Sequence, residues 1–298
     1  MDQLILSNGK LAFSANSCGL ETNKGKPLVI CLHGFPDNAR SFRHQLPFLA
    51  DAGYRVIAPT LRGYESSSQP DDKDYLVATM ARDVIAWIDK LGEQKVHLVG
   101  HDWGAVITYA AGALAPERFY SLTTLAVPHG ARFIDGVRKV PSQLLKSWYM
   151  NFFQLPGIAE FVLQRNDWAF IKTLWKNWSP GFELPNKEWT ELRQTFEAPG
   201  VKNAMLSYYR QNISPRIMLG IKQTEASLLT SVPVPTLAIT GSDDGCIDTR
   251  LYDHTFLDED FPMGYRIERI LGAGHFCHQE KSEQINSLLL DWLKENNS

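Results

Sequence analysis

The chain has 298 residues, 44% of them hydrophobic, and a formal net charge of −3. This length can bury one large core, or a core with an inserted subdomain. A nearly neutral chain without a basic run is not typical of nucleic-acid-binding proteins, and no apolar stretch reaches the roughly 18 residues of a membrane span. We therefore expect a small-molecule ligand, with neither nucleic acid nor a membrane as partner.

The N-terminus and the cysteines bear on the compartment of the protein. Residues 1–10 lack the basic region, long apolar core and cleavage site of a secretory signal, so we predict an unprocessed cytoplasmic protein. The cysteines have neither zinc-site spacing nor the density of a disulfide-bonded scaffold. We predict no disulfide and no metal site; the four cysteines are Cys18, Cys31, Cys246 and Cys277.

Strands and helices alternate through the first part of the chain. Apolar runs mark the strands, and apolar residues at helical spacing mark the helices. The elements predicted up to residue 127 are strands at 27–32, 55–59, 96–99 and 121–127, and helices over 75–91 and from Ala105. Such alternation predicts an α/β fold with a mostly parallel central sheet flanked by helices.

The pattern changes between residues 131 and 227, where helical, aromatic-rich segments replace the alternation. We interpret this segment as a helical cap inserted between two parts of the core, 1–130 and 228–298. In the second part, strands are predicted at 235–241 and 265–270, followed by a last amphipathic helix that closes the sheet.

The sequence around Asp102 is the most informative in the chain. Gly100 and Gly104 flank it, an apolar strand precedes it and a helix follows, which is the context of a nucleophile elbow. The position that holds Ser in an esterase holds Asp102 here, so a covalent intermediate would be an alkyl ester. Taken alone, the motif could also be a turn with a polar residue.

A carboxylate nucleophile needs a base that later activates water, and the base needs an acid to orient it. His275 follows the last predicted strand, where a loop at the carboxyl edge of the sheet can bring it to the elbow. The acid should follow the preceding strand, where Asp244 is preferred and Asp243 and then Asp248 are the alternatives. The alternative interpretation of these acids is that they are turn and helix-cap residues.

Four other histidines lack such a context, and we interpret them as structural residues. They are His44, His97, His254 and His278.

A second group of candidates follows the strand at 27–32, where the main-chain amide of Phe35 is positioned to join that of Trp103 in an oxyanion hole. Without the elbow, this stretch would be an ordinary strand-end turn.

These segments together resemble the epoxide hydrolase branch of the α/β-hydrolase superfamily, and the resemblance covers nearly the whole chain. It implies an α/β-hydrolase fold with an inserted helical cap. The matching segments are His33-Gly34-Phe35-Pro36, Gly100-His101-Asp102-Trp103-Gly104, Tyr149 to Gly157, Tyr208-Tyr209-Arg210 and Gly274-His275-Phe276. One departure is Glu65, which follows Arg62-Gly63-Tyr64 where the family commonly has glycine.

The resemblance implies that Tyr149 and Tyr209 are the ring-opening tyrosines of the cap. The chemistry needs them, because an epoxide oxygen leaves as an alkoxide and requires a hydrogen-bond donor. Viewed singly, each could be an aromatic residue of the cap core. The matched segments also put His33, Pro36 and Gln154 at the substrate pocket.

The implied reaction joins a small hydrophobic epoxide and water to give a vicinal diol, without a metal or organic cofactor. A haloalkane dehalogenase with the same Asp102 nucleophile is one alternative, although dehalogenases often carry Asn where Phe35 stands. A catalytically silent binding protein with the same fold is the other. The sequence leaves the choice between monomer and homodimer open.

Overall fold

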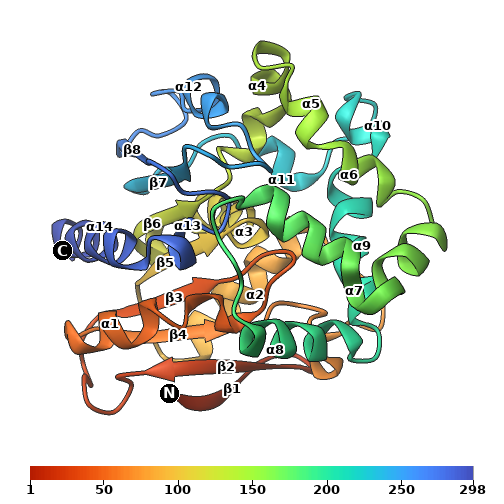
Figure 1. Cartoon of the computed structure of the whole chain (residues 1–298). Helices are drawn as coiled ribbons and strands as arrows, with labels where there is room; N and C mark the ends of the chain where they lie inside the picture. Colours follow the sequence, from red (N-terminus) through yellow and green to blue (C-terminus); the bar gives the residue numbers. More distant parts are fainter. Residues whose placement is uncertain (298) are drawn as a thin grey trace.

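An eight-stranded sheet forms the centre of the molecule in the computed structural model, which describes residues 1–297 (Figure 1). The strands are β1 (Asp2–Asn8), β2 (Leu11–Cys18), β3 (Leu28–Leu32), β4 (Arg55–Pro59), β5 (Val96–His101), β6 (Phe119–Leu125), β7 (Thr236–Gly241) and β8 (Tyr265–Ile270). Their order in the sheet is β1-β2-β4-β3-β5-β6-β7-β8. Only the β1–β2 and β2–β4 pairs are antiparallel, so the predicted mostly parallel sheet is confirmed.

Helices flank the sheet on both faces (Figure 1). The α-helices are α1 (Gln45–Asp51), α2 (Val77–Lys90), α3 (Trp103–Leu114), α4 (Phe133–Lys139), α5 (Gln143–Lys146), α6 (Trp148–Phe152), α7 (Ile158–Trp178), α8 (Asn186–Glu197), α9 (Val201–Asn212), α10 (Pro215–Met218), α11 (Glu225–Leu228), α12 (Tyr252–Thr255), α13 (Cys277–Glu280) and α14 (Ser282–Glu295). Short 3₁₀ helices are η1 (Ala39–Phe42), η2 (Ser66–Ser68), η3 (Pro116–Arg118), η4 (Gly130–Arg132) and η5 (Thr249–Leu251).

Two apolar clusters fill the space between the sheet and its helices. One contains α1 and α14, whose Leu46 and Leu289 pack against β3, β5 and β7. The other contains Trp87 of α2, Ile107 of α3 and much of the segment between β6 and β7. All six residues of β5 are buried, as expected for a central parallel strand covered on both faces.

The first two strands are not predicted by the sequence analysis. In β2 the inward positions hold Phe13, Ala15 and Ser17, a weakly apolar set that gives little hydrophobic alternation. The hairpin instead gains its stability by pairing with β4 and by contact with α2. The predicted strands and helices that follow are found within a few residues of their expected positions.

Helices α4 to α11 are inserted between β6 and β7 and lie to one side of the sheet in Figure 1. This insertion contains the segment predicted as a cap. Across residues 1–297, no helix combines the length and apolar character needed to cross a membrane. The four cysteines are free thiols, and Cys31, Cys246 and Cys277 are buried.

Candidate active site

Asp102 sits at a strained turn between β5 and α3. Its backbone has φ 51° and ψ −117°, a region that non-glycine residues seldom adopt. The turn needs glycine on both sides, because a Cβ at Gly100 would overlap the carbonyl group of Gly104, and one at Gly104 would overlap that of Leu32. The tight turn holds the Asp102 carboxylate at the carboxyl end of the central strand.

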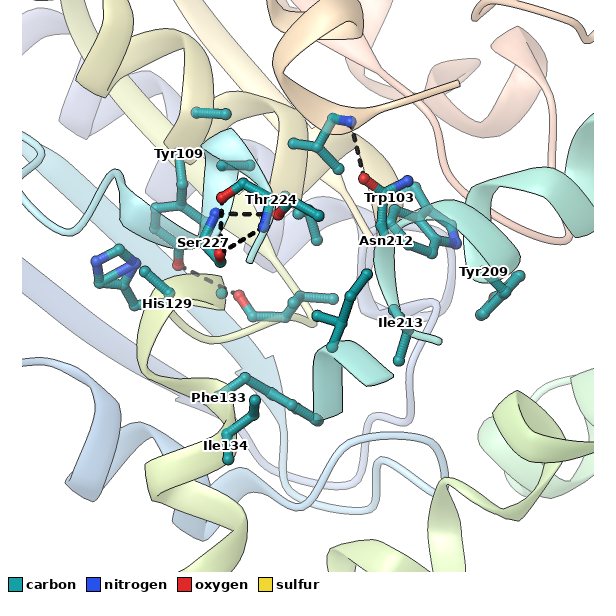
Figure 2. A pocket seen from close by; sticks show the side chains of 18 of the residues that line it. Trp103, Tyr109, His129, Phe133, Ile134, Tyr209, Asn212, Ile213, Thr224 and Ser227 are labelled. Carbon is teal, nitrogen blue, oxygen red and sulfur yellow. Dashed lines mark hydrogen bonds between the residues drawn. The ribbon is translucent and has the colours of Figure 1, made fainter. Parts of the chain in front are cut away.

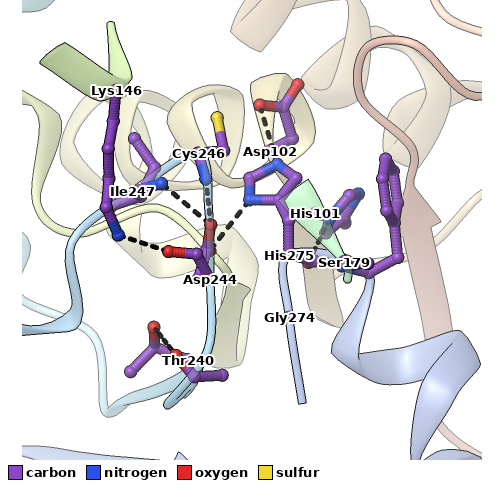
Figure 3. Close-up of polar contacts among 12 residues, drawn as sticks. His101, Asp102, Lys146, Ser179, Thr240, Asp244, Cys246, Ile247, Gly274 and His275 are labelled. Carbon is purple, nitrogen blue, oxygen red and sulfur yellow. Dashed lines mark hydrogen bonds and ion pairs between the residues drawn. The ribbon is translucent and has the colours of Figure 1, made fainter. Parts of the chain in front are cut away.

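His275 lies between two carboxylates (Figure 3). Its Nδ1 is 2.9 Å from Oδ2 of Asp244, and its Nε2 is 3.4 Å from Oδ2 of Asp102. The Asp244–His275 contact is a hydrogen bond, whereas the contact with Asp102 lacks hydrogen-bond geometry. The side chain of His275 is fully buried, so both contacts are shielded from solvent. The three side chains have the arrangement of nucleophile, base and orienting acid.

The two carboxylates control the charge of His275. Burial disfavours the imidazolium and lowers the pKa, but the charges of Asp244 and Asp102 outweigh this effect and raise the pKa of His275 to about 10. His275 is therefore positively charged near neutral pH as long as Asp102 keeps its negative charge. Loss of the Asp102 charge would lower the pKa and make His275 available as a base.

The structure distinguishes the three candidate acids. Oδ1 of Asp244 accepts hydrogen bonds from the main-chain amides of Cys246 and Ile247, at 2.7 and 2.8 Å, which aims Oδ2 at His275. Asp243 is exposed and accepts a hydrogen bond from the neighbouring serine. Asp248 caps η5 and pairs with an arginine. Of the three, the structure brings Asp244 to His275.

One of the two amides expected to form an oxyanion hole contacts the carboxylate of Asp102. The amide of Phe35 donates a 2.7 Å hydrogen bond to Oδ1 of Asp102. Trp103 is the first residue of α3, and the first amides of a helix have no intrahelical acceptor. Oδ1 therefore faces the amide of Phe35 while Oδ2 faces His275, which gives the two oxygens of one carboxylate different surroundings.

Tyr149 and Tyr209 come from two helices of the inserted segment, α6 and α9. Their ring centroids are 5.8 Å apart, and the Tyr209 ring packs edge-on against Trp103 at 5.1 Å. The Tyr149 hydroxyl is 3.4 Å from Sγ of Cys246, while the Tyr209 hydroxyl is buried with no hydrogen-bond partner among residues 1–297. Burial raises the pKa of both phenols well above the usual value of 10, so both remain protonated donors.

A cavity joins these groups (Figure 2). Asp102, Trp103, Tyr149 and Tyr209 line one part of it, and it extends between α3 and the inserted helices as far as His129. Its empty volume is about 1080 Å³, including the opening to solvent. Most of its lining side chains are apolar, which is the usual character of a site for a small hydrophobic ligand.

Comparison with known proteins agrees with this geometry. A family model described as the alpha/beta hydrolase fold matches residues 27–282. The chain belongs to the α/β-hydrolase family. It is 32% identical over 294 residues to the AB hydrolase superfamily protein YfhM of Bacillus subtilis, with 98% of this chain and 97% of that protein covered.

The relatives of this α/β-hydrolase include proteins named as epoxide hydrolases. Epoxide hydrolase A of Mycobacterium tuberculosis is 30% identical, with 90% of this chain and 91% of that protein covered. A crystal structure of a point mutant of an epoxide hydrolase from Bacillus megaterium matches with a TM-score of 0.84 at 25% identity, covering 98% of this chain and 100% of that one. The resemblance noted in the sequence therefore holds over the whole fold.

Three residues that the sequence analysis assigns to the substrate pocket of this α/β-hydrolase are not among those that line the cavity. His33 is buried and accepts a hydrogen bond from the amide of Leu61. Pro36 turns its carbonyl toward Trp175, and Gln154 donates to main-chain carbonyls within the inserted helices. Their hydrogen bonds join them to other parts of the protein.

Other residues support the site without having been predicted. The carbonyl of Trp178, the last residue of α7, accepts hydrogen bonds from the amides of Gly245 and His275 at 3.1 and 2.9 Å. Nε2 of His101 donates to the carbonyl of His275 at 3.0 Å. One inserted helix thus ties together the loops that carry Asp244 and His275. No local sequence signal could have revealed these contacts, since each joins distant parts of the chain.

The unusual Glu65 has a structural explanation. Its carboxylate accepts hydrogen bonds from the amide and hydroxyl of Ser14 in β2, at 2.6 and 2.7 Å. The preceding Arg62 pairs with the buried Asp83 and accepts a hydrogen bond from Tyr208 through its carbonyl. The departure from the family pattern therefore anchors the loop to the first hairpin, outside the residues that line the cavity.

Proposed function

We propose that this α/β-hydrolase opens epoxides to vicinal diols through a covalent ester on Asp102. The observation that carries the proposal is a single cavity lined by the carboxylate of Asp102 and by Tyr149 and Tyr209. A carboxylate can attack a ring carbon, and buried phenols can stabilise the oxygen that leaves. The activity named for the relatives above supports the same assignment.

In the first step, Oδ2 of Asp102 attacks one ring carbon and the bond from that carbon to the epoxide oxygen breaks. The oxygen receives a proton from a phenol, Tyr149 or Tyr209, and becomes the first hydroxyl of the product. Esterification removes the negative charge of Asp102, and the pKa of His275 falls because one of its two partner charges is gone. The proton that His275 then loses neutralises the tyrosinate.

In the second step, neutral His275 accepts a proton from water while the water oxygen attacks the ester carbonyl. The tetrahedral intermediate carries its negative charge on Oδ1, where the amides of Phe35 and Trp103 stabilise it. Collapse breaks the bond to the alkyl oxygen, which takes up the remaining acid proton as the second hydroxyl. Asp102 returns as a carboxylate beside protonated His275, so protons balance over the cycle.

Asp244 acts by orientation in this scheme. Its two amide hydrogen bonds fix Oδ2 on Nδ1 of His275, which leaves Nε2 as the nitrogen that exchanges protons. The substrate is a small hydrophobic epoxide together with water, and the scheme uses neither a metal nor an organic cofactor.

The test is hydrolysis of styrene oxide and of a terminal chloroalkane by the wild type and Asp102→Asn, with diol and halide measured in the same samples. We expect diol from the wild type, no diol from the variant and no halide from either. Halide without diol would assign the haloalkane dehalogenase reaction instead. Neither product, from a folded wild type, would contradict the enzyme assignment in favour of a binding protein.

A further inference from the structure

The cavity extends from Asp102 along one side of the site. Trp103, Val106 and Ala110 line it, and these positions lie on one face of α3. Seven residues separate the first from the last, so this face spans about 10 Å at about 1.5 Å per residue. Figure 2 shows Trp103 and Tyr209 on one side of the space and His129 on the other. We call the part of the cavity that extends from Trp103 toward His129 the chamber.

Away from the cavity, the tyrosine pair packs against aromatic rings. Phe35 lies 5.3 Å from Tyr209 and 5.5 Å from Phe153, measured between ring centroids. Trp178 lies 4.9 Å from Tyr149. The rings of Phe35, Phe153 and Trp178 are buried, and none of them is among the residues that line the cavity. This side has close-packed rings where the chamber has open space.

The chamber walls are apolar. Val106, Ala110, Phe133, Ile213 and Leu229 all line it. Two of them lie on α3 and one on α4, while Ile213 directly follows α9 and Leu229 directly follows α11. The chamber is therefore enclosed from several directions. Each methylene group of a hydrocarbon chain that is buried against such walls increases the binding affinity about fourfold.

The polar side chains along the chamber have hydrogen bonds within the protein. The side chain of Asn212 bonds to main-chain groups, and Thr224 and Ser227 bond to each other in a capping box. The Tyr109 hydroxyl is 2.7 Å from a threonine hydroxyl, and Nε2 of His129 donates to a main-chain carbonyl at 2.7 Å. Of these groups, only Nδ1 of His129 is buried without a partner among residues 1–297. The other groups offer little to a polar substituent, so the chamber favours an apolar one along most of its length.

We propose that the enzyme selects terminal epoxides, with one apolar substituent in the chamber and only hydrogens on the other ring carbon. With the ring between Asp102 and the two phenols, one substituent has about 10 Å of space. A second substituent on the other carbon would meet the rings of Phe35, Phe153 or Trp178. This inference rests on the proposed function, because it assumes that an epoxide binds at Asp102.

Two isomeric epoxides test the proposal directly. Hexyloxirane carries all six additional carbons on one ring carbon, whereas trans-dipropyloxirane divides them equally between the two. The two epoxides have the same molecular formula, so a difference in kcat/KM reports a preference for the shape of the substrate. We expect kcat/KM for hexyloxirane to exceed that for its isomer by about tenfold or more, since the chamber buries several methylenes of only the first.

A variant that fills the chamber provides a second test. Ala226 lines the chamber from α11 and is partly buried, so Ala226→Trp should fill the space. We expect the ratio of kcat/KM for hexyloxirane to that for methyloxirane to fall by about tenfold or more. This ratio does not depend on the fraction of folded enzyme. Leu228, exposed on the same short helix and outside the lining, supplies the matched control Leu228→Trp, which should leave the ratio unchanged.

The outcomes separate this inference from the proposed function. Equal or faster hydrolysis of trans-dipropyloxirane, or an unchanged ratio in Ala226→Trp, would overturn the terminal-epoxide proposal while the epoxide hydrolase assignment stands. Absence of diol from hexyloxirane, methyloxirane and styrene oxide alike would overturn both. Preference for hexyloxirane that is lost in Ala226→Trp and kept in Leu228→Trp would support both.

Discussion

Two sides of the candidate active site are held by different kinds of contact. We call the side at the ends of the strands the sheet side, and the side formed by Tyr149 and Tyr209 of the inserted helices the cap side. On the sheet side, directional hydrogen bonds join Phe35 to Asp102 and Asp244 to His275. On the cap side, aromatic packing holds Tyr149 and Tyr209, and the hydroxyl of Tyr209 has no partner among residues 1–297. Packing fixes a ring without engaging its hydroxyl, so the cap can present donors that are free for substrate.

Mutations should act differently on the two sides. On the sheet side, the polar atoms to which the proposed mechanism assigns the chemistry also make the contacts that hold the site together. On the cap side, the proposed mechanism assigns these two tasks to different atoms, because the ring packs and the hydroxyl donates the proton. Removing a functional group should therefore change geometry and electrostatics on the sheet side but chemistry alone on the cap side.

The largest effect is expected for His275→Gln, which removes the base of the second step. Turnover should fall by about 10⁴-fold, whereas the attack by Asp102 should persist. The protein should then accumulate the ester, and its intact mass should increase by one epoxide. The matched control is the double variant Asp102→Asn/His275→Gln, which should gain no mass. A His275→Gln protein that loses turnover without gaining mass would contradict the ester.

The next effect separates two adjacent acids. Asp244→Asn should lower kcat/KM by about 10³-fold, because it removes the acceptor and the charge beside Nδ1 of His275. Asp243→Asn is the control, since Asp243 is exposed and points to a serine. Steady-state kinetics on one epoxide is sufficient. Equal losses in the two variants would remove the orienting role from Asp244.

The adjacent Tyr208 and Tyr209 test the cap side. Tyr209→Phe should lower the rate of ester formation by about 10²-fold with little change in stability, because its hydroxyl makes no hydrogen bond to any of residues 1–297. Tyr208→Phe should do the reverse, since the Tyr208 hydroxyl donates to the carbonyl of Arg62 at 2.7 Å and lies outside the cavity lining. Its loss should cost about 1 kcal/mol of unfolding free energy.

Single-turnover kinetics and urea unfolding of the two phenylalanine variants measure these effects side by side. The expected pattern is a kinetic defect without instability in one variant and instability without a comparable kinetic defect in the other. If Tyr209→Phe reacts at the wild-type rate, the phenol does not assist ring opening, and the cap side would then be a passive wall.

The last effect is on stability at different pH values. The folded state raises the pKa of His275 from 6.5 to about 10, so the protonated histidine stabilises the fold. This contribution is fully present below about pH 6.5 and is lost as the pH rises through about 10. The wild type should therefore lose stability across this interval more steeply than His275→Gln, by at most about 1.4 kcal/mol per pH unit for one proton.

Denaturant unfolding of both proteins at several pH values measures this difference, and groups other than His275 cancel in the comparison. Parallel stability curves for the two proteins would mean that the carboxylates do not hold a proton on His275. The sheet side would then resemble the cap side, with geometry that does not depend on charge.

The sequence alone indicated the parallel core and the residues around the elbow. These signals are local: a glycine pair around Asp102 is required by a turn that admits no Cβ, and an apolar run marks a buried strand. The order of Asp102, an acid and His275 along the chain follows from the ends of successive strands, which meet at one edge of the sheet. Such features are encoded within a few residues.

Tertiary structure alone decided which groups face each other and where the open space lies. Asp243 and Asp244 are neighbours in sequence, but only the second turns its carboxylate to His275, because two amides of the following turn orient it. The chamber is formed by side chains from α3, α4, α9 and the segment around α11, and His33 and Pro36 are not among the residues that line the cavity. A cavity depends on the packing of distant segments, and no local sequence pattern records where packing leaves space.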